Sequence, residues 1–378
     1  MLMHIPFNKV YLTGKEESYV ANALKGDKLT GGGNHTAWCK ENLTKRYGFD
    51  NLHLTTSCTA ALETAALLLN LQAGDEVIIP SYTFVSTANA FALRGAKIVF
   101  ADSAAANPNI DADTIEPLIS KRTKAIVPVH YGGVACDMNK ISDLAKKHNF
   151  MVVEDAAHSI DAYFYNRPLG SLGDMAAFSF HETKNITCGE GGALLMNNRL
   201  FNERTEIILD KGTNRKIFAE GKTDKYEWVG LGSSYRMAET SAAFLRAQLE
   251  ELDGIQKIRM ELWNAYYSAL TDAGLQEFFS LPVLPHYAKH NASVFYVVCN
   301  SRALRDKLIS GLAAKGIASA FHYQPLHSSP FYSAMQQKPV VLPNSEKFGN
   351  CLLRLPLHAN LSKDNIHYVT ELIIKILN

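Results

Sequence analysis

The stretch MAAFSFHETKNITCGEGGALLMN, residues 175–197, places two apolar runs on either side of a polar turn. The runs at 175–180 and 192–197 have the length and composition of strands buried in a sheet. The turn carries one lysine, Lys184, and ends in the glycine-rich segment GEGG. Lysine side chains are usually exposed, so a solvated surface residue is the simplest interpretation of Lys184. Its place at the carboxyl end of a buried strand also makes it a candidate for chemistry.

The segments before this stretch alternate between apolar runs and helical patterns. Continuous apolar runs are typical of parallel strands that are buried on both faces of a sheet. The alternation therefore favours a large, doubly wound, mostly parallel α/β domain with its active site at the carboxyl ends of the strands. The expected strands are 76–80, 97–102, 124–131, 150–157, 175–180 and 192–197, and the expected helices are 59–70, 83–95, 111–121 and 137–149.

A smaller unit follows the predicted sheet. A long helical pattern leads from 238 to 273, with an interruption expected near Gly254. The pattern then changes to one typical of a compact α+β unit. We therefore predict a large domain over 1–250 and a small C-terminal α+β domain over 251–378. The further elements of the small domain are expected at 293–299, 302–316, 317–323 and 363–377.

The composition argues against several classes of protein. The 378 residues, 47% of them hydrophobic, are enough for one large core and a second, smaller one. The 38 Lys and Arg residues balance 37 Asp and Glu residues without long runs of one sign, so nucleic acid is not an expected partner. Without a signal-peptide pattern or an apolar run of ~18 residues, the chain is expected to be cytoplasmic, with no membrane partner. The six cysteines form no C-x-x-C pair and the histidines no H-E-x-x-H motif, so we expect neither disulfides nor a metal site.

Three polar features occur where the predicted sheet would bring them together. A helix begins at Ser57–Thr59, and a helix start holds phosphate through its unpaired N–H groups, although Ser and Thr also cap helices without any ligand. Glu154, Asp155 and His158 lie at the carboxyl end of a strand, where an acidic pair favours a functional interpretation. With Lys184 they supply a phosphate site, a carboxylate for a pyridine nitrogen and an amine for a Schiff base. These are the parts needed to hold pyridoxal 5′-phosphate.

Five motifs, taken in order, resemble those of the DegT/DnrJ/EryC1/StrS family of sugar aminotransferases. They are TSCTAALE (56–63), PSYTFVSTANA (80–90), EDAAH (154–158), SFHETKN (179–185) and GEGG (189–192). The similarity extends over nearly the whole chain, from IPFN (5–8) to LRLPL (353–357). The resemblance implies the fold of the type I pyridoxal-phosphate enzymes. It also implies a homodimer in which each active site is completed across the interface.

The resemblance assigns roles to residues around the cofactor. Lys184 would bond covalently to pyridoxal phosphate, and Asp155 would pair with the nitrogen of its ring. The other implied contacts are Ser57, Cys58, Thr59 and Ser179 around the phosphate, Phe84 over the ring and His158 near the ring oxygen.

Further roles concern the partner subunit and the substrate. Many relatives have G-x-N-x-R where this chain has GSSYR (232–236), so Ser234 would replace an Asn that reaches the phosphate of the second subunit. Tyr235 and Arg236 would lie near that interface. The residues expected near the nucleotide sugar are His322, Tyr323 and His327, in the segment AFHYQPLH.

The activity implied is ping-pong transamination, with L-glutamate as amino donor and a nucleotide-linked keto sugar as acceptor. The preferred acceptor is dTDP-4-keto-6-deoxyglucose, which would give a dTDP-4-amino-4,6-dideoxyhexose for a cell-surface polysaccharide. A 3-keto sugar aminotransferase and a GDP-sugar 4-aminotransferase stay open as alternatives. A non-catalytic pyridoxal-phosphate-binding regulator is the alternative of another class, and the presence of Lys184 argues against it. Related sugar dehydratases carry a histidine at that position, and the G-x-G-x-x-G motif of a nicotinamide oxidoreductase does not follow any expected strand.

Overall fold

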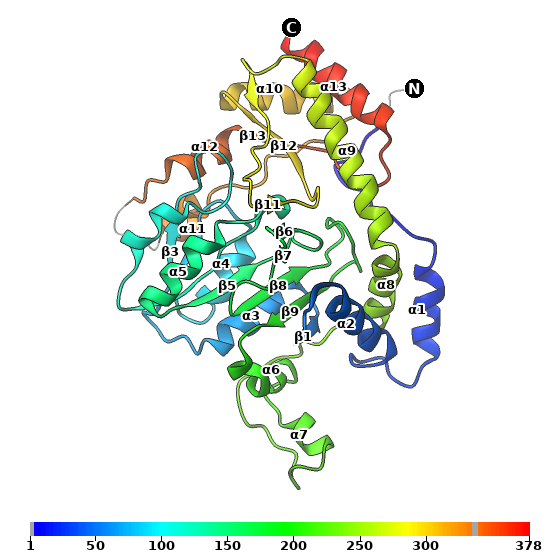
Figure 1. Cartoon of the computed structure of the whole chain (residues 1–378), viewed down its shortest axis with the longest axis vertical. Helices are drawn as coiled ribbons and strands as arrows, with labels where there is room; N and C mark the ends of the chain where they lie inside the picture. The colour runs from blue at the N-terminus through cyan, green and yellow to red at the C-terminus, as the bar shows by residue number, and fades with distance from the viewer. Residues whose placement is uncertain (1–3, 335–338) are drawn as a thin grey trace.

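A seven-stranded sheet forms the centre of the larger part of the molecule in the computed structural model, which describes residues 4–334 and 339–378 (Figure 1). The strand order is β1-β9-β8-β5-β4-β2-β3. Strand β9 runs antiparallel to β1 and β8, and the other neighbours run parallel. The predicted mostly parallel α/β sheet is therefore confirmed. Its strands are β1 (Leu52–Thr55), β2 (Glu76–Pro80), β3 (Lys97–Ala101), β4 (Thr123–Ile126), β5 (Met151–Asp155), β8 (Met175–Ser179) and β9 (Gly192–Met196).

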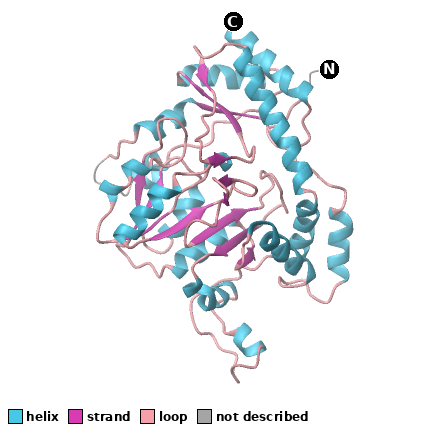
Figure 2. Cartoon of the chain, viewed as in Figure 1, coloured by secondary structure: helices cyan, strands magenta, loops and turns pink. Residues whose placement is uncertain are grey.

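Helices cover both faces of this sheet, because alternate residues of each strand point to opposite sides. Val153 and Ala177 share one core with α3 and α4, whereas Val152 packs with α5, and Phe178 packs with α2 and α8. Figure 2 shows these helices around the strands. The helices of this part are α1 (Glu16–Lys25), α2 (Asn34–Tyr47), α3 (Cys58–Leu68), α4 (Val85–Ala92), α5 (Met138–His148), α6 (Asn202–Leu209), α7 (Arg215–Ala219) and α8 (Glu239–Glu250).

A second core lies around a three-stranded sheet of order β10-β12-β13. Leu262 and Tyr266 of α9 pack in it, and Ile5 of the N-terminal segment joins them because its backbone pairs with Ile317. The elements of this part are α9 (Leu252–Asp272), β10 (Phe279–Ser280), β12 (Phe295–Cys299), α10 (Arg302–Ala313), α12 (Pro343–Cys351), β13 (Leu352–Leu355) and α13 (Lys363–Leu377). The short helix α11 (Pro330–Ser333) instead packs on the core of the large sheet, where the hydroxyl of Tyr332 donates a hydrogen bond to the carbonyl of Ile98 in β3.

Three segments differ from the sequence predictions. Two short 3-10 helices, η1 (Ala112–Thr114) and η2 (Glu116–Leu118), replace the helix expected at 111–121, because Pro117 cannot sit inside an α-helix. The run at 317–323 forms isolated backbone bridges in place of a strand. The long helical pattern is interrupted at Glu251, between α8 and α9, three residues before the expected break at Gly254.

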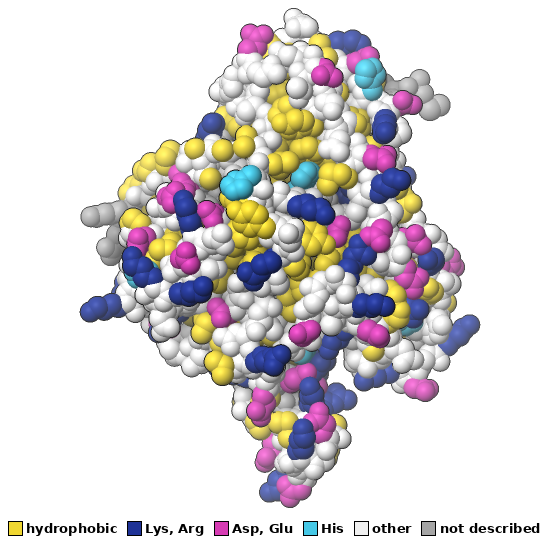
Figure 3. Space-filling model, viewed as in Figure 1, with side chains coloured by type: hydrophobic (Ala, Val, Ile, Leu, Met, Phe, Trp, Pro, Cys, Tyr) yellow, Lys and Arg dark blue, Asp and Glu magenta, His cyan; other side chains and the backbone are white. Residues whose placement is uncertain are grey.

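Short elements complete the molecule. A small sheet of order β11-β6-β7 pairs β6 (Tyr163–Phe164) and β7 (Arg167–Pro168) with β11 (Ala288–Lys289). The remaining 3-10 helices are η3 (Tyr131–Gly133), η4 (Arg199–Phe201) and η5 (Leu326–Ser328). On the face in Figure 3, Lys and Arg side chains are interspersed with Asp and Glu side chains. Within the described ranges, no helix is both long and apolar enough to span a bilayer.

Candidate active site

A cavity of about 520 Å³ lies where β2, β4, β5 and β8 end. Every cofactor residue predicted from the sequence lines it, apart from Ser234. His322 and Tyr323 line it as well, from the segment that precedes η5. The cavity is thus formed at the carboxyl edge of the sheet, as expected for an open α/β fold.

Lys184 lies in the cavity wall, in the turn that follows β8. Its backbone N–H donates a hydrogen bond to the carbonyl of His181 at 2.9 Å, which closes the turn. Desolvation by burial is the largest cause that lowers the pKa of Lys184, to about 8. The positive charge of Arg354 lowers it further, whereas the carboxylate of Asp155 acts in the opposite direction. The amine can therefore be neutral near physiological pH and act as a nucleophile or base.

Asp155 ends β5 and its carboxylate is held by two donors. The hydroxyl of Thr87 donates to it at 2.7 Å and the N–H of Ala157 at 3.1 Å. Burial raises the pKa of Asp155, although these hydrogen bonds and the nearby charge of Lys184 lower it. A cationic ring nitrogen beside this carboxylate would favour its ionised form, because opposite charges stabilise each other in a buried site.

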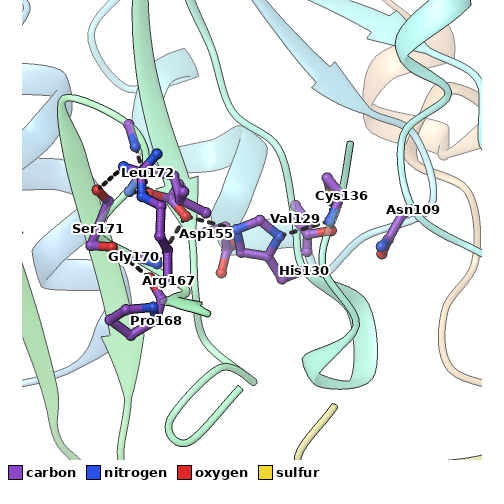
Figure 4. A network of polar contacts seen from close by, with 12 residues as sticks. Asn109, Val129, His130, Cys136, Asp155, Arg167, Pro168, Gly170, Ser171 and Leu172 are labelled. Carbon is purple, nitrogen blue, oxygen red and sulfur yellow. Dashed lines mark hydrogen bonds and ion pairs between the residues drawn. The ribbon is translucent and has the colours of Figure 1, made fainter. Parts of the chain in front are cut away.

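The neighbouring carboxylate, Glu154, points to the other face of the sheet, because side chains alternate along a strand. It lies 2.9 Å from Nε2 of His130 and is fully buried. It accepts backbone hydrogen bonds from Gly170, Leu172 and Gly173 at 2.8, 2.7 and 2.6 Å. Figure 4 shows how His130 and this loop approach each other. The two carboxylates therefore differ in role, since Glu154 anchors a loop and Asp155 faces the cavity.

The first turn of α3 is suited to hold a phosphate group. Ser57 caps the helix by accepting a hydrogen bond from the N–H of Ala60 at 3.0 Å. Among the described residues, the N–H groups of Cys58 and Thr59 have no protein acceptor, as expected at a helix start. These N–H groups and the positive end of the helix dipole attract anions.

Gly192 at the start of β9 lets the sheet approach this helix start. A Cβ atom at this position would lie 2.5 Å from the backbone nitrogen of Cys58 and 2.4 Å from the carbonyl carbon of Ser57. Any side chain would therefore displace the first turn of α3. Gly189 of the same GEGG segment serves the turn itself, since its φ is +81°.

Aromatic and imidazole groups form the other walls. Phe84 is 52% exposed in the cavity, and its ring centroid lies 5.9 Å from that of Tyr323. Nδ1 of His158 accepts a hydrogen bond from the N–H of Gly132 at 3.0 Å. Burial, assisted by the charges of Lys184 and Arg354, lowers the pKa of His158 well below its usual value. The ring is therefore neutral and carries its proton on Nε2, which makes it a hydrogen-bond donor.

Two predicted site residues lie away from this cavity. His327 is buried behind it, with Nδ1 2.6 Å from Oγ of Ser81 and Nε2 3.2 Å from a carboxylate oxygen of Glu346. Ser234 is exposed and forms an isolated bridge with Asp210. Its predicted role requires a second subunit and stays a prediction.

Sequence reasoning missed several residues of the site. Thr87 and Arg354 belong to segments whose motifs were recognised, but neither side chain was singled out. Phe7 lines the cavity from the N-terminal segment. Arg354 gave one usable signal, because a charged residue interrupts the apolar run LLRLPL at 352–357. Thr87 gave none, since a Thr on a helix has many ordinary roles.

The comparisons with known proteins cover nearly the whole chain. The model of the DegT/DnrJ/EryC1/StrS aminotransferase family matches residues 11–374. The uncharacterized protein MJ1066 of Methanocaldococcus jannaschii is 32% identical over 97% of this chain and 96% of its own length.

Solved structures give the same result. The pyridoxal-phosphate form of the putative sugar aminotransferase Spr1654 of Streptococcus pneumoniae has a TM-score of 0.90 at 25% identity and covers 100% of both chains. PseC of Helicobacter pylori, an aminotransferase of pseudoaminic acid biosynthesis, has a TM-score of 0.90 at 26% identity over 99% of both chains. DesV of S. venezuelae, solved with a ketimine intermediate, has a TM-score of 0.87 at 30% identity over 96% of this chain and 94% of its own.

The lowered pKa of Lys184 can be measured in protein stripped of any bound cofactor. Since the folded pKa is about 8, its amine is an ammonium ion below pH 8 and becomes reactive as the pH rises through that value. Competitive labelling with an isotopic anhydride, read by mass spectrometry of the peptide, should give a midpoint near 8 for Lys184. Lys140 is a suitable control, because its ion pair with Asp113 raises its pKa. A midpoint of 10 or above for Lys184 would contradict the effect of burial.

Proposed function

Because the chain belongs to the DegT/DnrJ/EryC1/StrS aminotransferase family, we propose that it transfers the amino group of L-glutamate to C4 of dTDP-4-keto-6-deoxyglucose. It is a pyridoxal-phosphate-dependent aminotransferase, as its family and structural neighbours are. The observation that carries the proposal is the single cavity in which Lys184, Asp155 and the start of α3 meet. The motifs resemble most those of dTDP-4-amino-4,6-dideoxygalactose transaminase. We therefore propose a 4-amino-4,6-dideoxyhexose product for a cell-surface polysaccharide such as enterobacterial common antigen or lipopolysaccharide.

The residues present fit the cofactor at both of its ends. The start of α3 would bind the phosphate through the free N–H groups of Cys58 and Thr59, with the hydroxyl of Ser179 close by in the same wall. Asp155 would hold the ring nitrogen protonated. Pyridoxal phosphate, when bound, supplies an electron sink for the negative charge that develops on the reacting carbon. Neutral His158 would donate a hydrogen bond from Nε2 to the oxygen on the cofactor ring.

Lys184 would provide the proton transfers of both half-reactions. A neutral amine takes a proton, and the pKa of about 8 makes this form available near neutral pH. In the first half-reaction Nζ would remove a proton from the α-carbon of glutamate. In the second, the protonated amine would return a proton to the sugar carbon that receives nitrogen. The two substrates would therefore bind in turn, which is ping-pong kinetics.

The sugar substrate would bind on the side of His322 and Tyr323, which line the cavity opposite the sheet. The backbone carbonyl of His322 accepts a hydrogen bond from the hydroxyl of Tyr131 at 3.1 Å, so the segment is fixed to the large domain. His327, predicted as a further substrate contact, would act from behind the cavity by holding Ser81 and the turn after β2.

A homodimer is the proposed assembly, supported by an arm that projects from the sheet domain beyond α6 (Figure 1). The arm carries α7 and ends near Ser234. Its large apolar side chains Tyr226, Trp228 and Leu231 are 56%, 77% and 60% exposed. Exposed apolar side chains gathered on one segment are typical of a protein interface. A partner subunit covering this arm would bring Ser234, Tyr235 and Arg236 towards the second active site.

The role of Asp155 is tested by Asp155→Asn in the purified holoenzyme. An amide cannot hold the ring nitrogen protonated, so kcat should fall on the order of 10²–10³-fold while the melting temperature changes little. Asp113→Asn is the control, because the carboxylate of Asp113 pairs with Lys140 at the surface. Turnover of Asp155→Asn near the wild-type rate would show that the carboxylate has no part in the chemistry.

The substrate is tested by incubating the enzyme and L-glutamate with dTDP-, UDP- and GDP-linked 3-keto and 4-keto sugars. NMR of the products should show amination at C4 of the dTDP-linked 6-deoxy sugar. His322→Ala should raise the KM for that sugar roughly 10-fold through the loss of a polar contact. Amination at C3, or a preference for a GDP-linked sugar, would contradict the proposed substrate. Absence of amination of every sugar in the panel would contradict it as well.

The assembly is tested by light scattering coupled to gel filtration. The mass should be twice that of the 41.8 kDa chain, and Trp228→Asp should shift the protein towards a smaller species with less activity. Lys222→Asp, also on the arm but in an exposed ion pair, is the matched control. A wild-type monomer with full activity would rule out the shared active site.

A further inference from the structure

Arg354 places a positive charge in the cavity wall without a negative partner. It belongs to β13, in the smaller of the two sheets that flank the cavity, and its backbone pairs with Ala320. The carbon centre of its guanidinium lies 5.1 Å from the centroid of the Phe7 ring. Its Nε atom is buried and has no hydrogen-bond partner, and no carboxylate within residues 4–334 and 339–378 forms an ion pair with it.

Several other arginines have their charge or their donors compensated, and Arg94, whose buried Nε atom also lacks a hydrogen-bond partner, does not line the cavity. Arg46 pairs with Asp253, and Arg236 pairs with Glu206. Arg259, which is fully buried, donates hydrogen bonds to the carbonyl groups of Ala292 and Ser293. A partly buried guanidinium that lacks such partners costs free energy, so a ligand is the natural source of its missing acceptor.

Among the residues that the structure describes, the one polar side chain hydrogen-bonded to Arg354 is itself a weak partner. Nη1 lies 3.2 Å from Nδ1 of His322. A guanidinium only donates hydrogen bonds, so Nδ1 must be the acceptor and His322 must be neutral. This agrees with the pKa of His322, which burial and the charge of Arg354 lower. This hydrogen bond to His322 uses one of the five N–H donors of the guanidinium and fixes the orientation of the group, so the other donors stay available.

We propose that Arg354 is the oxyanion anchor of the cavity and that its guanidinium binds a carboxylate or phosphate group of a substrate, with His322 as its positioning residue. A guanidinium is planar and offers paired donors that match both groups. This inference rests on the proposed function, which names two substrates that could supply such a group. The groups are the carboxylates of the amino donor and the diphosphate of the sugar nucleotide. The phosphate of the cofactor already has its own site at the start of α3.

The position of Arg354 also links substrate binding to the lysine. Its charge lowers the pKa of Lys184 and of His158, after burial, which is the larger cause for both. A bound oxyanion would offset this charge next to the reacting groups. The same residue would thus hold a substrate and adjust the electrostatic field around the amine.

The test measures binding, so it does not depend on turnover. Titration calorimetry on the holoenzyme in its pyridoxal form would use 2-oxoglutarate and dTDP as separate probes. Arg354→Gln should weaken binding of one probe or both by roughly 10–100-fold, as expected for the loss of charge-assisted hydrogen bonds. Arg354→Lys should give an intermediate loss, because it keeps the charge but not the paired donors. Arg46→Gln is the matched control, since that guanidinium also lies over an aromatic ring, at 5.6 Å from Tyr47, but away from the cavity.

The outcomes separate the two ligands. Weaker binding of 2-oxoglutarate alone assigns Arg354 to the amino donor, and weaker binding of dTDP alone assigns it to the sugar nucleotide. Affinities within twofold of wild type for both probes, in variants that keep the cofactor absorbance and melting temperature, would overturn the proposal. So would a wild-type enzyme that binds neither probe. If the dTDP-linked 4-keto sugar of the panel described above were not aminated, the proposed substrate would be wrong. The 2-oxoglutarate measurement would still test whether Arg354 binds a carboxylate.

Discussion

Desolvation at the carboxyl edge of the sheet is the constraint on which the site depends. Burial acts in the same sense on Lys184, Asp155 and His158, since it moves each of them towards its neutral form. For the lysine and the histidine this gives a base and a hydrogen-bond donor near neutral pH. For the aspartate it leaves a carboxyl group whose charge depends on a cation beside it. A cationic ring would meet that need, so the enclosed site and its cofactor are complementary.

The alternation of side chains along the strands lets one sheet serve both structure and chemistry. At the end of β5, Glu154 binds the loop at 170–173 on one face and Asp155 faces the cavity on the other. At the start of β9, the absence of a side chain at Gly192 lets the first turn of α3 come close. Both features depend on backbone positions that a shift of one residue in register would reverse.

The smaller part of the molecule completes the cavity from the other side. It contributes His322, Tyr323 and Arg354, none of which lies on the large sheet. The groups proposed to act on the cofactor therefore come from one scaffold, and the groups proposed to select the substrate come from another. Such a division would allow one fold to serve different substrates, because function lies in the site and not in the fold.

The sequence by itself determined the alternation of strands and helices and the sheet edge at which the site lies. Those properties follow from local patterns, because apolar runs, helix starts and polar residues at strand ends each have a short-range cause. The residues expected around the cofactor came from the family resemblance of the motifs, and all of them except Ser234 line the cavity. Only the tertiary structure decided that Glu154 and Asp155 have different roles and that His327 lies behind the cavity. It also brought Thr87 to Asp155 and left Arg354 without a carboxylate. These facts depend on contacts between segments far apart in the chain, and packing, which no local pattern records, decides which side chains meet.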